Sequence, residues 1–140
     1  MISVSCSVFI TNENKILLVR ENKVNKWGLP GGRIELDETL PGCAIRECRE
    51  ETGLEVEIKD LIFISQKSHS REGNNVVRFI YSAEIVGEIN EKEMTYQYFA
   101  RKKFEQLAAQ DKIRGKDVIK LAQDFYDGKI EKFNRNPEVF

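Results

Sequence analysis

Three glutamates, Glu47, Glu50 and Glu51, lie within five positions of a chain whose overall charge is nearly balanced. They belong to residues 32–54, GRIELDETLPGCAIRECREETGL, which hold six acidic side chains and three arginines. Like charges spaced three and four residues apart on a helix repel one another. Divalent cations such as Mg²⁺ and Mn²⁺ relieve this repulsion because they prefer oxygen ligands and commonly pair carboxylates with substrate phosphates. A divalent cation site is therefore one interpretation of the cluster.

The ends of this stretch indicate a helix. Thr39 is a suitable N-cap, Pro41 is tolerated in the first turn, and Gly53 is a natural C-terminal stop. At roughly 100° per residue, the three glutamates fall within an arc of about 100°. A separate arc, which we expect to pack on a sheet, holds Pro41, Ala44, Ile45, Cys48 and Thr52. The helix is thus predicted to be anchored on one face and to present three carboxylates on another.

The acidic face also has a simpler interpretation. Charge runs are usually solvated surfaces, and Arg46 and Arg49 would then serve as ion-pair partners of the glutamates. The residues around the glutamates decide between the two interpretations, as described below.

The segments around this helix have the patterns of strands. Residues 2–10 alternate between apolar and polar side chains, residues 11–14 (TNEN) supply turn chemistry, and residues 15–20 form a more continuous apolar run. Further strands are expected over residues 54–64, 76–85 and 95–99. Loops are expected over residues 25–32 and 65–75.

After residue 100 the apolar pattern acquires a helical period. Two helical faces are expected, one with Phe104, Leu107 and Ala108 and one with Val118, Leu121, Ala122 and Phe125. Gly128 ends the second helix, and residues 129–140 are expected to form a surface strap or a frayed end. The order of strands, helix, strands and helices predicts an α/β fold, a mixed sheet with helices packed on it.

Composition restricts the class of protein. The 140 residues predict a single domain over positions 1–140. The 22 Lys and Arg residues balance 23 Asp and Glu residues, which argues against nucleic-acid or anionic-membrane partners. Apolar runs of four or five residues are too short to span a membrane, and the first residues do not have the pattern of a signal peptide. Three cysteines without metal-type spacing favour buried thiols and a reduced, cytoplasmic setting.

The residues flanking the glutamates match a known pattern. Gly32 is followed after five residues by Glu38, and after seven more residues by REXXEEXG from Arg46 to Gly53. This sequence resembles the Nudix box, GX5EX7REUXEEXGU, where U is aliphatic. All seven fixed identities agree, a chance event on the order of 10⁻⁹ per starting position. Cys48 departs from the usual aliphatic residue, and we expect only a small packing loss from it.

The resemblance implies a Nudix-type α/β/α sandwich, with the box helix on one side and the C-terminal helices also packed on the sheet. It implies metal-dependent hydrolysis of a nucleoside diphosphate linked to another moiety, X, with Mg²⁺ or Mn²⁺ as the cofactor. The implied metal ligands are Glu47, Glu50, Glu51 and the Gly31 carbonyl. The implied partner is a small-molecule nucleotide, and a homodimer is an open alternative to a monomer.

Other box residues would have supporting roles. Arg46 would orient the glutamates, and Glu38 would support the helix start or a metal-bound water. Gly32 and Gly53 are structural positions of the box. Together with Arg46, the predicted catalytic residues are Glu47 and Glu50, with a general base drawn from the box or from a later loop.

Candidates outside the box each have an alternative role. Glu91 or Glu93, before the last strand, could supply the general base or could belong to a polar hairpin loop. Arg20 and Arg33 suit anion binding, although surface exposure is the commoner fate of an arginine. Trp27 is a candidate for stacking on a base, and capping the core is the preferred alternative.

The substrate is left open by the sequence. In the family, ADP-ribose and dinucleoside-polyphosphate hydrolases carry a proline or a tyrosine downstream of the box, and the corresponding region here, KSHSR, has neither. A (d)NTP or modified nucleotide therefore leads, with a nucleotide sugar or ADP-ribose as the alternative. A nucleotide-sensing module without catalysis ranks lower, because all three box glutamates are present.

Overall fold

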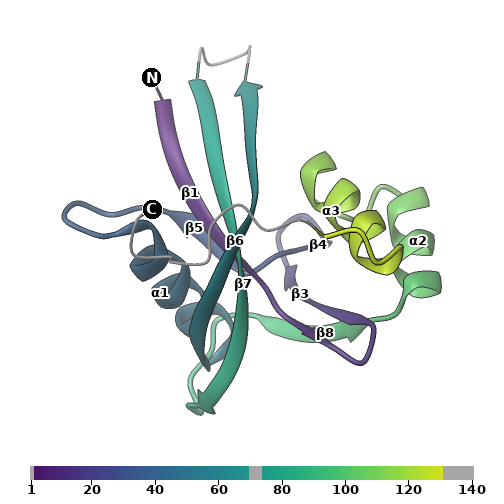
Figure 1. The fold of residues 1–140 in the computed structure, drawn as a ribbon, viewed down its shortest axis with the longest axis horizontal. Coiled ribbons are helices and arrows are strands. Elements are labelled where there is room, and N and C mark those ends of the chain that lie inside the picture. The colour runs from purple at the N-terminus through teal and green to yellow at the C-terminus, as the bar shows by residue number, and fades with distance from the viewer. Residues whose placement is uncertain (1, 70–73, 131–140) are drawn as a thin grey trace.

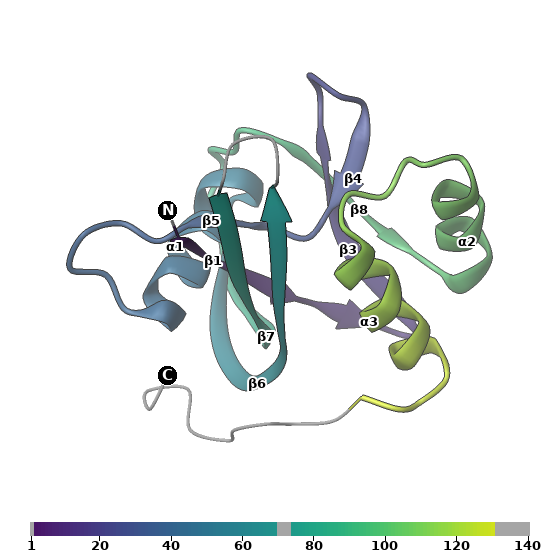
Figure 2. The same cartoon turned by 90° about the horizontal axis from the view of Figure 1, so that it is seen from above.

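Helices cover two sides of a layer of β-sheet in the computed structural model, which describes residues 2–69 and 74–130. Helix α1 (Leu40–Thr52) lies on one side, and α2 (Arg101–Ala109) and α3 (Lys116–Tyr126) lie on the other (Figure 1). The view from above shows the same separation (Figure 2). The predicted α/β/α sandwich is therefore confirmed.

The larger sheet has the strand order β5-β1-β7-β6. Its members are β1 (Ile2–Phe9), β5 (Gly31–Arg33), β6 (Leu54–His69) and β7 (Asn74–Glu88). Strands β1 and β7 are parallel, whereas β1 with β5 and β6 with β7 are antiparallel. The sheet is mixed, as predicted.

The smaller sheet is arranged around β3 (Lys15–Glu21). It also contains β2 (Thr11–Asn12), β4 (Lys26–Gly28) and β8 (Thr95–Phe99), all antiparallel to β3. The turn between β2 and β3 has positive φ at Glu13 and Asn14, 49° and 63°. Two successive positive φ angles suit a two-residue hairpin turn, which confirms the turn predicted there.

Helix α1 has the predicted ends. The Thr39 hydroxyl accepts a hydrogen bond from the Gly42 N–H at 3.0 Å, and Gly53 adopts a left-handed conformation with φ of 75°. The Gly53 N–H donates to the Arg49 carbonyl at 2.8 Å. Both helix ends are therefore satisfied by local chemistry, as N-cap and C-cap rules require.

The two sides of the sheets form two apolar cores. On the α1 side, Cys43, Ala44 and Cys48 pack with strand residues such as Leu17 and Leu61. On the other side the helices contribute Phe104, Leu107, Val118, Leu121 and Ala122. The buried faces predicted for the C-terminal helices are confirmed, and all three cysteines are buried and unpaired.

Two loop predictions were wrong in part. Strand pairing in the β6–β7 hairpin continues to His69 and Asn74, although residues 65–69 are polar. Short strand β4 also lies inside the expected loop at residues 25–32, and β5 begins within it and ends at Arg33. Sheet pairing uses backbone groups, so polar or glycine-rich segments join a sheet when a neighbouring strand lies beside them.

Residues 70–73 of the expected hairpin loop and residues 131–140 of the expected tail lie outside the described residues. Within the described ranges, no helix is both long and apolar enough to cross a membrane.

Candidate functional site

The box glutamates do not share one environment. The Glu51 side chain is buried, with 7% of its surface exposed, and its Oε1 accepts a hydrogen bond from the Gly31 N–H at 2.9 Å. Burial raises the pKa of Glu51 to about 7 and also raises that of Glu47. Glu50 is 44% exposed. The helical wheel predicted that the three glutamates share one face of α1, and on that face Glu51 is covered because β5 packs against its side of the helix.

Arg46 connects the carboxylates of the site. Its Nε lies 2.6 Å from Glu38 Oε2, and its Nη1 lies 2.9 Å from Glu47 Oε1 and 3.3 Å from Glu50 Oε2. Its Nη2 donates to the Arg33 carbonyl at 3.0 Å. The hydrogen bond from Arg46 is the main cause that lowers the pKa of Glu38. Arg46 therefore ties the helix to the chain around β5 and fixes the direction of Glu47.

The paired glycines allow the strand to lie close to the glutamates. A Cβ on Gly32 would lie 2.5 Å from the carboxylate carbon of Glu47. A Cβ on Gly31 would lie 2.5 Å from the Cys6 carbonyl oxygen and would also overlap the Ser7 hydroxyl. The spacing between β5 and its neighbours thus requires the absence of side chains at both positions.

The segment before β8 crosses the C-terminal end of α1. The Glu93 N–H donates to the Glu50 carbonyl at 3.0 Å, and the Met94 N–H donates to the Glu51 carbonyl at 2.9 Å. These bonds satisfy carbonyls that a helix end leaves without partners. Burial is the main cause of the raised pKa of Glu47 and of Glu51, and the negative charge of Glu93 raises both pKa values further. The structure therefore brings Glu93 to the box glutamates.

A cavity of about 520 Å³ opens beside these residues, and we call it the carboxylate cavity. Glu47, Glu51, Gly31 and Gly32 form its acidic wall, and Arg33, Arg78 and Arg114 also line it. Carboxylates and arginines thus face the same space, an arrangement that suits a cation together with a phosphate group.

The donor set fits Mg²⁺ or Mn²⁺. Within the described residues, no three His, Cys, Asp or Glu side chains already converge as a metal cluster. Glu47 and Glu51 nevertheless offer hard oxygen atoms to one cavity, and burial disfavours their charged forms. A cation would favour those charged forms. Glu47 and Glu51 would hold it, and Glu50 would join them by exchanging its contact with Arg46.

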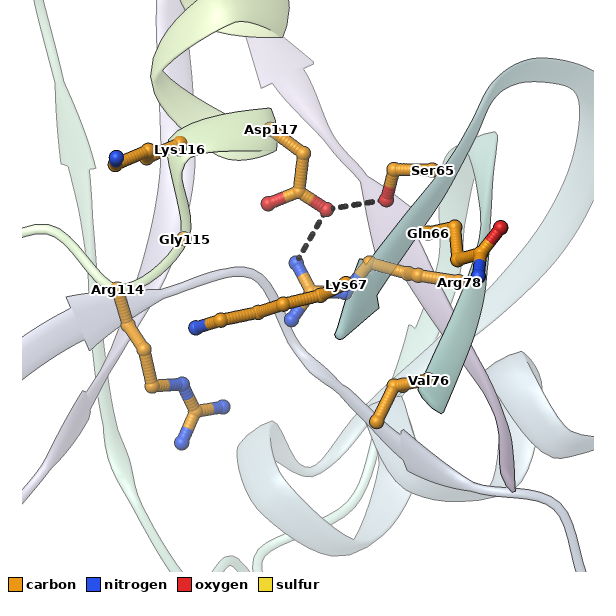
Figure 3. A pocket seen from close by; sticks show the side chains of 9 residues that line it. All are labelled: Ser65, Gln66, Lys67, Val76, Arg78, Arg114, Gly115, Lys116 and Asp117. Carbon is orange, nitrogen blue, oxygen red and sulfur yellow. Dashed lines mark hydrogen bonds and ion pairs between the residues drawn. The ribbon is translucent and has the colours of Figure 1, made fainter. Parts of the chain in front are cut away.

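A second cavity of about 550 Å³ adjoins the first and shares Val76, Arg78 and Arg114 with it. We call it the basic cavity; Figure 3 shows Lys67 extending into it opposite Arg114. Asp117, at the start of α3, accepts a hydrogen bond from the Ser65 hydroxyl at 2.7 Å and lies 3.4 Å from Arg78 Nη1. The two cavities are thus neighbours with a shared wall; the first holds the carboxylates of Glu47 and Glu51, and the second is mainly cationic.

Three candidates from outside the box have different positions. Arg33 lines the carboxylate cavity, whereas Arg20 bonds the Asn25 side chain at 2.7 Å and 3.1 Å in the β3–β4 hairpin. Trp27 packs edge-to-face on Phe99 with ring centroids 4.8 Å apart. Neither Arg20 nor Trp27 is among the described residues that line the carboxylate cavity or the basic cavity.

Sequence reasoning missed Arg78, Arg114, Lys67 and Asp117. Arg78 had a usable signal, since it is the only charged residue within the apolar run of residues 76–83. Arg114 lies in an ordinary-looking turn, and its N–H donates to the Trp27 carbonyl at 2.7 Å. No local pattern could have placed Arg114 in the cavity that holds Glu51, because this depends on the tertiary position of the segment before α3.

Comparisons with known proteins agree with this site. The family model described as NUDIX domain matches residues 1–121. The human 8-oxo-dGDP phosphatase NUDT18 is 28% identical over 122 residues, which cover 84% of this chain and 36% of that protein. The ADP-ribose pyrophosphatase of Methanocaldococcus jannaschii is 32% identical over 88 residues, which cover 61% of this chain and 52% of that protein.

The chain thus spans about a third to a half of the length of these curated relatives. Among solved structures, a NUDIX hydrolase from Nitrosomonas europaea has the same fold, with a TM-score of 0.83 at 22% identity over 100% of this chain and 96% of that chain. Because the family model covers most of the sequence, and because the box residues Gly32, Glu47 and Glu51 line the carboxylate cavity, the chain belongs to the Nudix hydrolase family.

Proposed function

We propose that this protein hydrolyses the diphosphate linkage of a nucleoside diphosphate joined to a moiety X, in a reaction that requires Mg²⁺ or Mn²⁺. One observation carries the proposal: Glu47 and Glu51 share a cavity of about 520 Å³ with Arg33, Arg78 and Arg114. Phosphoryl transfer depends on positioning and charge stabilisation. It therefore needs both carboxylates that hold cations and arginines that bind phosphate oxygens.

When bound, a divalent cation would neutralise the diphosphate and lower the pKa of an attacking water. The residues of the chain have separate parts in this scheme. Arg46 fixes the directions of Glu38 and Glu47 through its guanidinium. Arg33 and Arg114 would bind phosphate oxygens. Glu93, beside the glutamates, would accept the proton of the attacking water at its carboxylate.

Within this reaction class, a (d)NTP or a modified nucleotide is the leading substrate. The similarity to a protein named 8-oxo-dGDP phosphatase supports it, over 84% of this chain. ADP-ribose or a nucleotide sugar is the second candidate, supported by the archaeal relative named ADP-ribose pyrophosphatase. A sensor without catalysis is less favoured, because Glu47, Glu50 and Glu51 are all present in the box.

The test is product release from a panel of nucleotides with Mg²⁺, Mn²⁺ or EDTA. The panel holds canonical and oxidised dNTPs, nucleotide sugars, ADP-ribose and dinucleoside polyphosphates. Glu50→Gln should lower kcat/KM by about 100-fold, as expected for the loss of one metal-supporting group. Glu105→Gln removes an exposed carboxylate from α2 as the matched control and should retain full activity. Tight nucleotide binding by the wild type without any turnover would instead support the sensor.

A further inference from the structure

The basic cavity is lined by more cationic side chains than its carboxylate can neutralise. Four cationic side chains line it, against one carboxylate: Lys67, Arg78, Arg114 and Lys116 against Asp117. Figure 3 shows Lys67 and Arg78, from β6 and β7, and Arg114, from the segment before α3, around one space, with Lys116 at its rim. Like charges brought together in a concave site repel unless an anion lies among them.

The single carboxylate, Asp117, already has hydrogen-bond and ion-pair partners within the protein. Asp117 Oδ2 accepts from the Ser65 hydroxyl at 2.7 Å and lies 3.4 Å from Arg78 Nη1, while its Oδ1 accepts from the Val118 N–H at 2.9 Å. These contacts join β6, β7 and α3 at one point. Asp117 therefore holds the wall of the cavity together and is not free to neutralise the remaining cations.

The cations differ in how much of their charge is matched. Arg114 pairs with Glu21, at the edge of the carboxylate cavity. Lys67 and Lys116 have no ion pair among the residues that the structure describes. Arg78 Nη1 is buried and lies 3.4 Å from Asp117 Oδ2. It makes no hydrogen bond to any residue that the structure describes. Buried polar groups nearly always have a partner, so this N–H lacks an acceptor that a ligand oxygen would supply.

The position of the basic cavity assigns it to the substrate. Arg78 and Arg114 line both cavities, so a molecule whose diphosphate lies against Glu47 and Glu51 would pass these arginines before reaching Lys67. We propose that the basic cavity binds a further anionic group of the substrate, a phosphate or a carboxylate on moiety X, beyond the diphosphate that is cleaved. The orientation of X rests on the function proposed above, whereas the preference for an anion rests on the charges of the cavity.

Two sources of this anionic group are separable by experiment. The terminal phosphate of a nucleoside triphosphate is one, and an acidic sugar is the other. The matched pairs are dGTP with dGDP and UDP-glucuronate with UDP-glucose, each differing in one anionic group. We expect at least one pair to show a kcat/KM higher by about tenfold for the more charged member, with the ratio falling as salt is added.

The variant Lys67→Gln/Lys116→Gln removes two exposed charges while keeping chain length. It should reduce the ratio within the preferred pair by about fivefold, a size typical of two solvent-exposed charge interactions. Lys102→Gln/Lys103→Gln makes the same charge change on the exposed face of α2, outside the lining of both cavities, and should leave the ratio unchanged.

The outcomes separate this inference from the proposed function. Turnover that depends on metal and on Glu50, with no preference for the more charged member of either pair, would overturn the anionic subsite alone. A preference that both double variants lower equally would also overturn it, since a general surface charge would then be the cause. If the wild type cleaves none of these nucleotides, the dissociation constants of both members of each pair are measured in Mg²⁺ instead. Equal affinities within each pair would refute the inference.

Discussion

At the scale of single residues, Arg46 has more carboxylates around it than one guanidinium neutralises. Its nitrogens contact Glu38, Glu47 and Glu50, and Glu35 lies 3.5 Å from its Nη1. Among the described residues, Glu51 forms no ion pair; it accepts a hydrogen bond from the Gly31 N–H and shares its cavity with Arg114. The excess negative charge is then concentrated where the cavity opens, so the metal-free protein should be sensitive to pH.

Glu51→Gln should stabilise the metal-free protein above neutral pH. Burial raises the pKa of Glu51 from 4.5 to about 7, so the folded-state value lies above the unfolded one. The stability that this group confers is present at low pH and is lost as pH rises through the folded-state pKa. The wild type should therefore lose about 3 kcal/mol of unfolding free energy across this window, at about 1.4 kcal/mol per pKa unit.

Urea unfolding in EDTA, on both sides of this pH window, measures the effect. Gln keeps an Oε1 acceptor for the Gly31 N–H and removes the charge, so the variant should show a shallower pH dependence than the wild type. Adding Mg²⁺ at high pH should restore the wild type more than the variant, since a ligand of the folded state stabilises it. Identical pH profiles in EDTA would show that Glu51 is not the group responsible.

At the scale of elements, strand β5 is only three residues long but determines how closely α1 approaches the larger sheet. Gly31 pairs with Ser7 of β1, and Gly32 lies against the Glu47 side chain. One glycine therefore faces another strand and the next faces the site. Substitution at these two neighbouring positions should give different kinds of defect.

Gly31→Ala should impair folding, and Gly32→Ala should impair activity. The new Cβ at position 31 would lie 2.5 Å from a backbone carbonyl, that of Cys6, which moves only with its strand. Overpacking of this kind destabilises by about 1–3 kcal/mol. At position 32 the Cβ meets the end of the Glu47 side chain, which moves by rotation and then leaves its place beside Arg46.

Thermal unfolding and kcat/KM, measured for both variants, separate the two effects. Gly32→Ala should retain most of its Tm and lose about tenfold or more in kcat/KM, a loss comparable to that of groups supporting a metal ligand. The reverse pattern, a destabilised Gly32→Ala and a fully stable Gly31→Ala, would contradict the contacts described for β5.

At the scale of the whole molecule, the site depends on segments from both sides of the sheet. Helix α1 supplies the carboxylates, and the segment between α2 and α3 supplies Arg114. That segment is attached to β4 by backbone bonds: the Trp27 N–H donates to the Lys112 carbonyl at 2.8 Å, and the Arg114 N–H donates to the Trp27 carbonyl at 2.7 Å. Trp27 thus connects the apolar core to the basic wall of the site.

Trp27 is partly buried against the core, so Trp27→Ala should lower the unfolding free energy by about 3 kcal/mol, the low end of the usual loss for a large buried aromatic. It should also raise KM, because the backbone that carries Arg114 loses its packed support. Trp27→Phe should keep most of both properties, since a smaller ring still packs on Phe99. Unfolding free energies and KM for the two variants test this; an unchanged stability with a raised KM in Trp27→Ala would favour base stacking instead.

Much of the fold was predictable because its signals are local. The ends of α1 follow from Thr39 and Gly53, and the buried faces of α2 and α3 follow from apolar residues at helical spacing. The β2–β3 turn follows from the TNEN sequence. The extent of the β6–β7 hairpin was not predictable, because its outer part on β6 is polar and joins the sheet by backbone pairing, which leaves no apolar pattern in the sequence.

The family and the box residues could be inferred from the sequence, since seven side-chain identities at fixed spacing along one helix and its approach encode them. Tertiary structure decided which glutamate is buried, because β5 covers Glu51 and leaves Glu50 in solvent. Packing of distant segments also places Arg78 and Arg114, thirty-six positions apart, in the shared wall of the two cavities. Side-chain spacing along a chain specifies local chemistry, whereas convergence of distant residues depends on how strands pair and helices pack.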